Sequence, residues 1–262
     1  MATNSRNPLP KTLKATRAPK QGKGVKKAAG KKKIFLLLAG KYFLMLWAVS
    51  MIWLIGLRFF APPATLLMLQ RKNDSLEETG KWKNLRYKAV QVEDVSKQVP
   101  LAMIASEDQN FLNHAGFDFK AMQKAFEHNQ RGRTVRGGST ISQQVAKNVF
   151  LWNGRSYLRK ALEAYFTAII ELIWDKERIM EMYLSVAETG NLIFGVEEAS
   201  RWAFRKSANE VSRSEAATIA AVLPNPRKYS AKNPTAFIIR KRDRIAKHMR
   251  LIGGTSLVEF FY

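Results

Sequence analysis

The chain has 262 residues, of which 44 are Lys or Arg and 21 are Asp or Glu, so its formal net charge at pH 7 is +23. This length suits one well-cored domain with appendages rather than two full domains. Because there is no cysteine, disulfides and thiolate metal sites are excluded. The histidines, His114, His128 and His248, share no metal-ligand spacing.

The N-terminal region changes abruptly in composition. Residues 1–33 contain eleven Lys or Arg and no acid, which predicts a disordered basic tail. The apolar run at 34–60 follows, and its uninterrupted part, Tyr42 to Leu57, predicts one transmembrane helix if Lys41 extends its ammonium to the headgroups. A cleaved signal peptide or a buried core helix is the alternative, but no small-x-small cleavage site precedes Pro62.

The basic tail also predicts the orientation of the chain. By the positive-inside rule, the N-terminus lies in the cytoplasm and residues 61–262 lie outside the inner (cytoplasmic) membrane, in the periplasm. A charge of +23 would suggest nucleic acid, but the tail is better explained as a topology signal that contacts anionic lipid, so we expect no nucleic-acid partner. The rest of the chain carries 33 minus 21, or +12, and still needs an anionic partner.

Beyond the span, residues 61–84 are expected to form a membrane-proximal connector that becomes structured near Trp82, and residues 85–262 one domain. From Val99 onward the apolar pattern is helical, without the period-two alternation of a sheet. We therefore expect an all-α or α-dominated domain. Capping signals place helix starts at Asp118 (running to about Gln130), at Thr140 with Gln143, at Ser212 with Glu215, and at Asn233-Pro234, with Gly253-Gly254 closing the last helix.

The stretch "RGRTVRGGSTISQQVAKNVF" combines glycines, hydroxyls and a helix start. Gly137 and Gly138 let backbone approach a ligand, while Ser139 and Thr140 offer hydroxyls next to free helix N–H groups. This junction is therefore a candidate anion site. A flexible glycine loop with an ordinary cap is the alternative.

The next helix, in "SYLRKALEAYFTAIIELIWD", is expected to carry a core stripe formed by Leu158, Leu162, Tyr165, Ile169 and Ile173. Arg159 and Glu163 share another face. Their pairing is either an ordinary salt bridge, which stabilises a helix by about 0.2–0.5 kcal/mol, or part of a site in which Arg159, Lys160 and Lys147 bind phosphate and Glu163 faces the same cleft.

Two adjacent acids, Glu107 and Asp108, stand in "EDQNFLNHAGFD", and three further motifs follow: "GGSTISQQVAKN", "RKALE" and "KERIMEMYLS". These four motifs in this order resemble the family 51 glycosyltransferases, the peptidoglycan glycan-chain polymerases, in their monofunctional biosynthetic form, over about residues 85–250. One departure is Ser185, where the family usually has Asn. The lost amide is expected to loosen a local hydrogen bond.

The resemblance implies a lysozyme-like, two-lobed fold and lipid II, with the lipid-linked glycan chain, as substrate. It implies that Glu107 is the general base for the 4-hydroxyl of the acceptor sugar, with Asp108 shaping the pocket. Glu163 would be the second essential carboxylate, assisting at the diphosphate directly or through a divalent cation (Mg or Mn); no tightly bound cofactor is expected. The other implied contacts are Phe111, His114, Ser139, Thr140, Gln144, Lys147 and Asn148 in the cleft, and Arg159 and Lys160 at the diphosphate. For His114 a structural hydrogen bond is an equal alternative.

Two other function classes remain open. A lysozyme-like hydrolase or lytic transglycosylase would also place a catalytic Glu on a helix, but it has no need of three cations in one cleft. A non-catalytic anchored scaffold is the other alternative, and wall-synthesis or division proteins are possible partners in either case. No Ser-x-x-Lys motif occurs in the chain, so peptide cross-linking is not expected.

Overall fold

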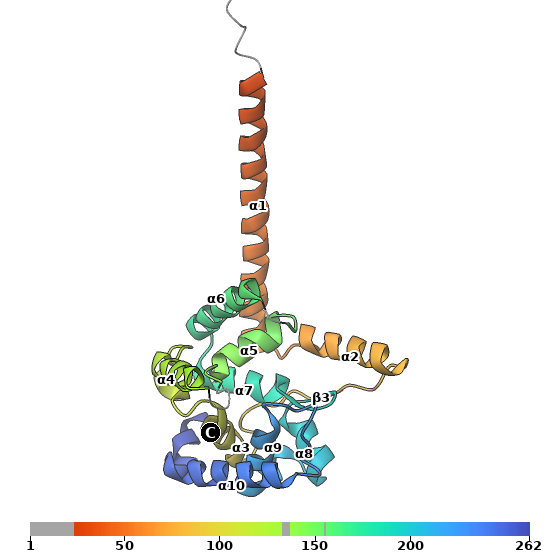
Figure 1. Cartoon of the computed structure of the whole chain (residues 1–262), viewed down its shortest axis with the longest axis vertical. Helices are drawn as coiled ribbons and strands as arrows, with labels where there is room; N and C mark the ends of the chain where they lie inside the picture. Colours follow the sequence, from red (N-terminus) through yellow and green to blue (C-terminus); the bar gives the residue numbers. More distant parts are fainter. Residues whose placement is uncertain (1–23, 133–136, 155) are drawn as a thin grey trace, which may run out of the picture. The chain divides into compact units, whose positions relative to one another are not determined.

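The computed structural model describes residues 24–132, 137–154 and 156–262, with side chains from residue 35 onward. Its contacts divide it into one unit that ends at Ile52 and a second, Trp53–Tyr262 (Figure 1). Of the predicted basic tail, residues 1–23 lie outside the described residues.

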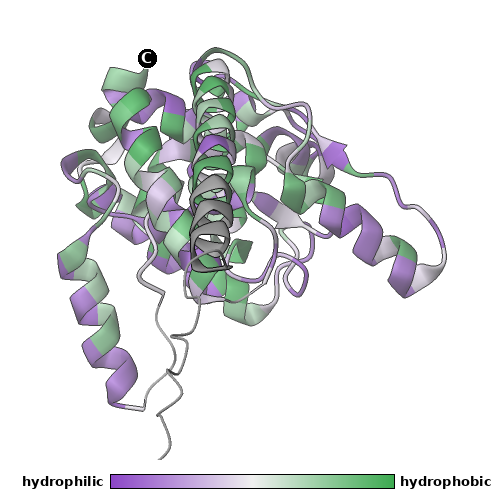
Figure 2. Ribbon diagram, turned by 90° about the horizontal axis from the view of Figure 1, so that it is seen from above, coloured by the Kyte–Doolittle hydropathy of each residue, from purple (hydrophilic) through white to green (hydrophobic). Residues whose placement is uncertain are grey.

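The first unit consists of most of helix α1, which spans Gly24–Phe59. Its segment Phe35–Phe59 is long and apolar enough to cross a membrane, and Figure 2 colours this segment mainly as hydrophobic. The helix begins earlier than the expected residue 34, because the Lys and Ala residues that precede the apolar run are good helix formers. Residues 24–33 are therefore helical, where the sequence had predicted disorder.

The second unit is dominated by helices, as predicted. They are α2 (Leu66–Thr79), α3 (Gln98–Glu107), α4 (Phe119–Gln130), α5 (Ile141–Phe150), α6 (Tyr157–Ile173), α7 (Lys176–Val186), α8 (Val196–Phe204), α9 (Arg213–Val222) and α10 (Ala236–Leu251), with short 3₁₀ helices η1 (Phe111–Asn113), η2 (Ala208–Glu210) and η3 (Gly254–Phe261). A small sheet has the order β1-β3-β2, from β1 (Arg86–Tyr87), β2 (Glu188–Gly190) and β3 (Ile193–Phe194). Strands of two or three residues are too short for an alternating pattern to be recognised.

The helices form two packed groups. In the first, α3 lies against α9 and α10, and η3 contacts both α3 and α10. In the second, α5 lies between α6 and α7 (Figure 1). Helix α7 is buried from Ile179 to Val186 and is the structural centre of the unit. This arrangement agrees with the predicted two-lobed domain.

The predicted caps are confirmed. The side chain of Asp118 accepts a hydrogen bond from Ala121 N at the start of α4, and capping boxes join Thr140 to Gln143 and Ser212 to Glu215. The last helix differs slightly from the expectation, because its cap is Thr235 rather than Asn233.

The predicted connector contains a helix, which the sequence analysis missed. Thr65 caps α2 by accepting from Met68 N, and Gly80, with φ 66°, ends it in the left-handed conformation that glycine favours. Helix α2 buries Leu67 and Met68, while its Leu66 and Leu69 side chains stay about half exposed, at 48% and 53%. The segment is therefore part of the folded unit.

The predicted core stripe of α6 is wrong. The buried positions of this helix are Glu163, Thr167 and Ile170. On other faces Leu158 is 67% exposed and Leu172 is 85% exposed. The other predicted stripe residues, Leu162, Tyr165, Ile169 and Ile173, are only half-buried. The helix thus turns a mixed polar face toward the protein and leaves its apolar side partly uncovered.

Ser185 compensates for the amide that the fourth motif usually supplies. Its buried hydroxyl accepts a hydrogen bond from Val90 N at 3.1 Å and donates one to Val90 O at 3.3 Å. The expected loosening is therefore not seen, because the hydroxyl satisfies both backbone groups.

Candidate active site

Glu107 is the last residue of α3 and is half-buried. Its Oε1 accepts a hydrogen bond from the Ser106 hydroxyl at 3.0 Å, and its Oε2 accepts one from Gln144 Nε2, on α5, at 3.1 Å. Gln144 Oε1 in turn accepts from the hydroxyl of Tyr183, on α7, at 3.4 Å. Neutral donors thus hold the carboxylate, which leaves it able to take up a proton.

Asp108 joins the end of α3 to the start of α5. Its buried carboxylate bonds His114 Nε2 at 2.9 and 3.0 Å and accepts from Ile141 N at 3.0 Å. For His114, the structural hydrogen bond that the sequence left open is therefore present. Asp108 shapes the site by connecting the two groups of helices.

The anion expected at the start of α5 is supplied by the protein itself. The Ile141 N–H is bonded to Asp108, and the Thr140 hydroxyl accepts from Gln143 N while donating to Gly116 O. Thr140 is buried and its hydroxyl proton is already donated, so it has no hydrogen-bond donor to offer a ligand. Ser139 stays exposed at the same loop.

Phe111 lies in the core rather than on the cleft surface, with no exposed area. The ammonium of Lys176 lies 4.6 Å from its ring centroid, and Lys176 Nζ also donates to His114 O at 2.6 Å. Phe111 therefore packs in the core beneath the loop of Asp108 and His114, and Lys176 contacts both Phe111 and this loop.

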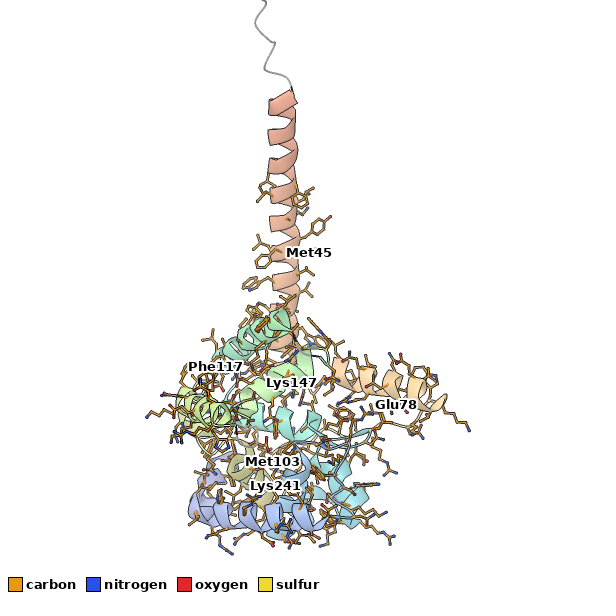
Figure 3. The ribbon with its side chains drawn as sticks, viewed as in Figure 1. Met45, Glu78, Met103, Phe117, Lys147 and Lys241 are labelled. Atoms are coloured by element: carbon orange, nitrogen blue, oxygen red, sulfur yellow. The ribbon has the colours of Figure 1, made fainter. Side chains whose placement is uncertain are left out.

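Lys147 lies on α5 (Figure 3), where the charges of both predicted carboxylates, Glu107 and Glu163, act on it. The pKa of its ammonium is lowered, chiefly because the surrounding protein removes water from it; the negative charges of Glu163 and Glu107 oppose this, and Arg159 and Lys160 add to it. Charged residues of the first motif (Glu107) and of the third motif (Arg159, Lys160 and Glu163) thus act on the same ammonium, although the two motifs stand far apart in the sequence.

Glu163 is buried and holds two cations on the same helix. Its Oε2 accepts from Arg159 Nη1 at 3.0 Å and its Oε1 from Lys160 Nζ at 2.5 Å. Arg159 Nε is buried without a hydrogen-bond partner among the described residues. Of the two alternatives that the sequence offered, the salt bridge is therefore present, while a phosphate site shared with Lys147 stays a prediction.

The site residues line three separate hollows rather than one cavity. Glu107, Asp108 and Ser139 line a hollow of 520 Å³; Gln144, Lys147 and Asn148 line a pocket of 210 Å³; and Arg159 and Lys160 line a shallow hollow of 360 Å³. Glu107 and Gln144 connect the first two through their hydrogen bond. This sequence of hollows suits an extended substrate.

A model of the Transglycosylase family matches residues 72–250. The chain belongs to this transglycosylase family. Similar relatives are the biosynthetic peptidoglycan transglycosylases of Pasteurella multocida, 46% identical over 227 residues (87% of this chain and 90% of the relative), and of Pseudomonas putida and Pseudomonas entomophila, 47% and 48% identical over 214 residues (81% of this chain and 90% of each relative). The family match begins within α2, so the transglycosylase domain includes part of the expected connector.

The residues around Glu163 of this transglycosylase fit a divalent cation poorly. Both carboxylate oxygens are already bonded to Arg159 and Lys160, so a metal ion would have to displace a cation from each. Among the described residues, the acidic side chains that lie close enough together to share a metal ion are Glu93, Glu177 and Glu181, and this cluster does not include Glu163.

Three residues of the transglycosylase site were not found from sequence. Tyr183 lies within the fourth motif, and burial, together with Glu107 and Asp108, raises the pKa of its hydroxyl. Lys241, on α10, donates to Ala221 O, and burial lowers its pKa while Glu107 opposes this (Figure 3). Glu188 lines the pocket of Lys147. The fourth motif singled out the segment of Tyr183 but not its contacts, and no local pattern marked Lys241 or Glu188, because these contacts join distant segments of the chain.

Proposed function

We propose that this transglycosylase polymerises the glycan chains of peptidoglycan. It transfers the growing lipid-linked glycan onto the 4-hydroxyl of lipid II, forms a β-1,4 bond with inversion and releases undecaprenyl diphosphate. The observation that carries the proposal is the position of Lys147 on the wall of the pocket that Gln144 shares, where its ammonium is influenced by the charges of Glu107, Glu163, Arg159 and Lys160.

The reaction needs a base and a way to neutralise the leaving group. Glu107 accepts its hydrogen bonds from Ser106 and Gln144, both neutral, and is the group we assign to remove the proton from the attacking hydroxyl. The proton moves to the carboxylate as the oxygen bonds to the anomeric carbon and the bond to diphosphate breaks.

The cations of α5 and α6 supply the second requirement. Negative charge grows on the diphosphate as the bond breaks, and Lys147, Arg159 and Lys160 stabilise it. Glu163 orients Arg159 and Lys160, and the unpartnered Nε of Arg159 offers one donor for a diphosphate oxygen. Arginine and lysine thus perform the neutralisation that a metal ion performs in other enzymes.

The apolar surface of the second unit supports a position at the membrane. Tyr157 and Leu158 begin α6 and are 98% and 67% exposed, and Phe60 and Leu69 of the preceding segments are also exposed. We propose that these side chains lie in the bilayer interface, so that the lipid tail of the substrate stays immersed while its sugars enter the cleft. The anchor would lie in the inner membrane, with its basic end in the cytoplasm.

A direct assay tests the function. Purified full-length protein is incubated with lipid II in detergent or vesicles, and the products are resolved on a gel. A ladder of glycan chains is expected. Hydrolysis of finished glycan without polymerisation would identify a lytic enzyme instead, and no reaction with either substrate would contradict both.

A further inference from the structure

One carboxylate oxygen of Glu188 is buried without a partner. Glu188 lies in β2, and its Oε2 accepts a hydrogen bond from Arg71 Nε, on α2, at 3.0 Å. Its Oε1 has no hydrogen-bond partner among the described residues. A buried acceptor left unpaired costs about 1–3 kcal/mol, so such an atom calls for an explanation.

Glu188 forms part of the wall of the 210 Å³ pocket that also contains Gln144 and Lys147. Gln144 is bonded to Glu107, so this pocket adjoins the reacting centre. The terminal torsion of a glutamate is soft and roughly two-fold. A small rotation therefore turns Oε1 toward the pocket while Arg71 keeps its bond to the carboxylate.

The rest of the pocket suits a sugar ring. Trp152 is 40% exposed, and Pro224 and Pro226 add apolar surface opposite the polar groups. Aromatic and apolar walls with a few placed polar groups are typical of sites for small organic ligands. The negative charge of Glu188 disfavours a diphosphate or a peptide carboxylate in its immediate surroundings, so an uncharged part of the substrate fits best.

We propose that Arg71 and Glu188 form a sugar subsite of the cleft, in which Glu188 accepts an N–H or O–H of one N-acetylated hexose unit of the substrate. This inference rests on the proposed function, because it assigns a further binding residue to the same substrate. Burial raises the pKa of Glu188, and Arg71 opposes this rise and orients the carboxylate. Asp74, 3.3 Å from Arg71 Nη1, holds Arg71 in turn.

The first test compares the substrate kinetics of two variants. Glu188→Gln keeps the size of the side chain and an oxygen for Arg71, but it places an amide where the free acceptor was. We expect its KM for lipid II to rise about tenfold with kcat changed less than about twofold. Glu78→Gln is the matched control, because it breaks another α2 ion pair, Glu78 with Arg227 at 2.6 Å, outside the pocket. Its KM should equal that of the wild type.

The second test measures binding without reaction, by calorimetry with a soluble peptidoglycan tetrasaccharide that lacks lipid and diphosphate. Wild type and Glu78→Gln should bind it equally, and Glu188→Gln about tenfold more weakly. If Glu188→Gln lowers only the melting temperature and changes neither KM nor this affinity, the pair is merely a structural attachment of α2 and the inference is wrong. If the wild type binds the tetrasaccharide but does not polymerise lipid II, the proposed function fails while the subsite stands.

Discussion

Glu107 and Gln144 are joined by a 3.1 Å hydrogen bond that connects α3 to α5. Because Gln144 also accepts from Tyr183 on α7, three helices meet at the carboxylate of Glu107. The amide of Gln144, held at its oxygen by Tyr183, fixes the orientation of the Glu107 carboxylate without neutralising its charge. This is the arrangement that a general base requires.

Removing this base should abolish most of the turnover. Glu107→Gln keeps the shape and an oxygen that accepts from Gln144, and its amide can donate to the Ser106 hydroxyl. Because it cannot take up the proton, we expect kcat on lipid II to fall by about 10²–10⁴ with substrate binding nearly unchanged. Glu127→Gln, an exposed acid on α4, serves as the control. Polymerisation by Glu107→Gln at the wild-type rate would disprove the assignment.

The charge of Lys147 should set the alkaline limit of activity. Its pKa is lowered from 10.5, so the ammonium loses its proton at a lower pH than an ordinary lysine does. Lys147→Arg keeps a charge that persists to higher pH. The alkaline limb of kcat/KM, measured as a function of pH, should therefore move upward in this variant. An unchanged limb would show that another group titrates there.

The same lowered pKa has a consequence for stability. At pH values between the folded and the unfolded pKa of Lys147, the unfolded chain binds more protons, so the free energy of unfolding rises with pH in that window. At neutral pH, where the ammonium is charged, Lys147 therefore lowers the stability of the folded protein. Lys147→Met should therefore raise the melting temperature at pH 7 while it lowers activity. Thermal unfolding followed by circular dichroism measures the melting temperature. A lower melting temperature in Lys147→Met would show that the ammonium stabilises the folded protein, contrary to this prediction.

Glu163→Gln should separate orientation from metal binding. If Glu163 orients Arg159 and Lys160, as their bonds to it indicate, the variant loses rate but its response to added Mg²⁺ or Mn²⁺ equals that of the wild type. Initial rates over a range of metal concentrations, with and without a chelator, measure this. Metal stimulation of the wild type alone would assign a cation to Glu163 after all.

Deletions of the N-terminus should distinguish anchoring from folding. Removing residues 1–52 leaves the second unit complete, so its melting temperature should be unchanged while turnover in vesicles falls. Removing residues 1–60 also removes Leu54 and Leu57, whose carbonyls accept from Trp174 Nε1 at 3.0 Å and from Arg178 at 2.8 and 3.0 Å. The longer deletion should lower the free energy of unfolding by about 3 kcal/mol or more, which lowers the melting temperature by about 6–12 °C. Equal melting temperatures for the two deletions would contradict the packing.

Local signals in the sequence predicted the helix starts well. Asp118, Thr140 and Ser212 each cap the helix that was expected to follow them, because a cap depends only on residues within one turn. The four motifs likewise identified the family, and the structure brings Glu107, Lys147 and Glu163 together. Roles assigned to individual residues beyond this geometry stay predictions.

The faces of α6 could not be predicted in the same way. Apolar periodicity assigned Leu158 and its neighbours to the core, but the helix buries Glu163 and Thr167 instead. Periodicity reports that one face is apolar, not whether protein or another apolar medium covers it. Glu188 was missed for a related reason, since its partner Arg71 stands 117 positions earlier in the chain.

Helix α6 carries the diphosphate cations and the apolar exposed residues on one rigid rod. Arg159 and Lys160 directly follow Tyr157 and Leu158 at its start, and each residue advances the helix by about 1.5 Å. If Leu158 is immersed in the interface, as proposed, the cations lie within a few residues of the bilayer surface, where the phosphate groups of lipids are found. On the proposed function, the depth to which the first turn of α6 is inserted would then set the height at which its cations meet the diphosphate of the substrate, and turnover would depend on the thickness and charge of the bilayer.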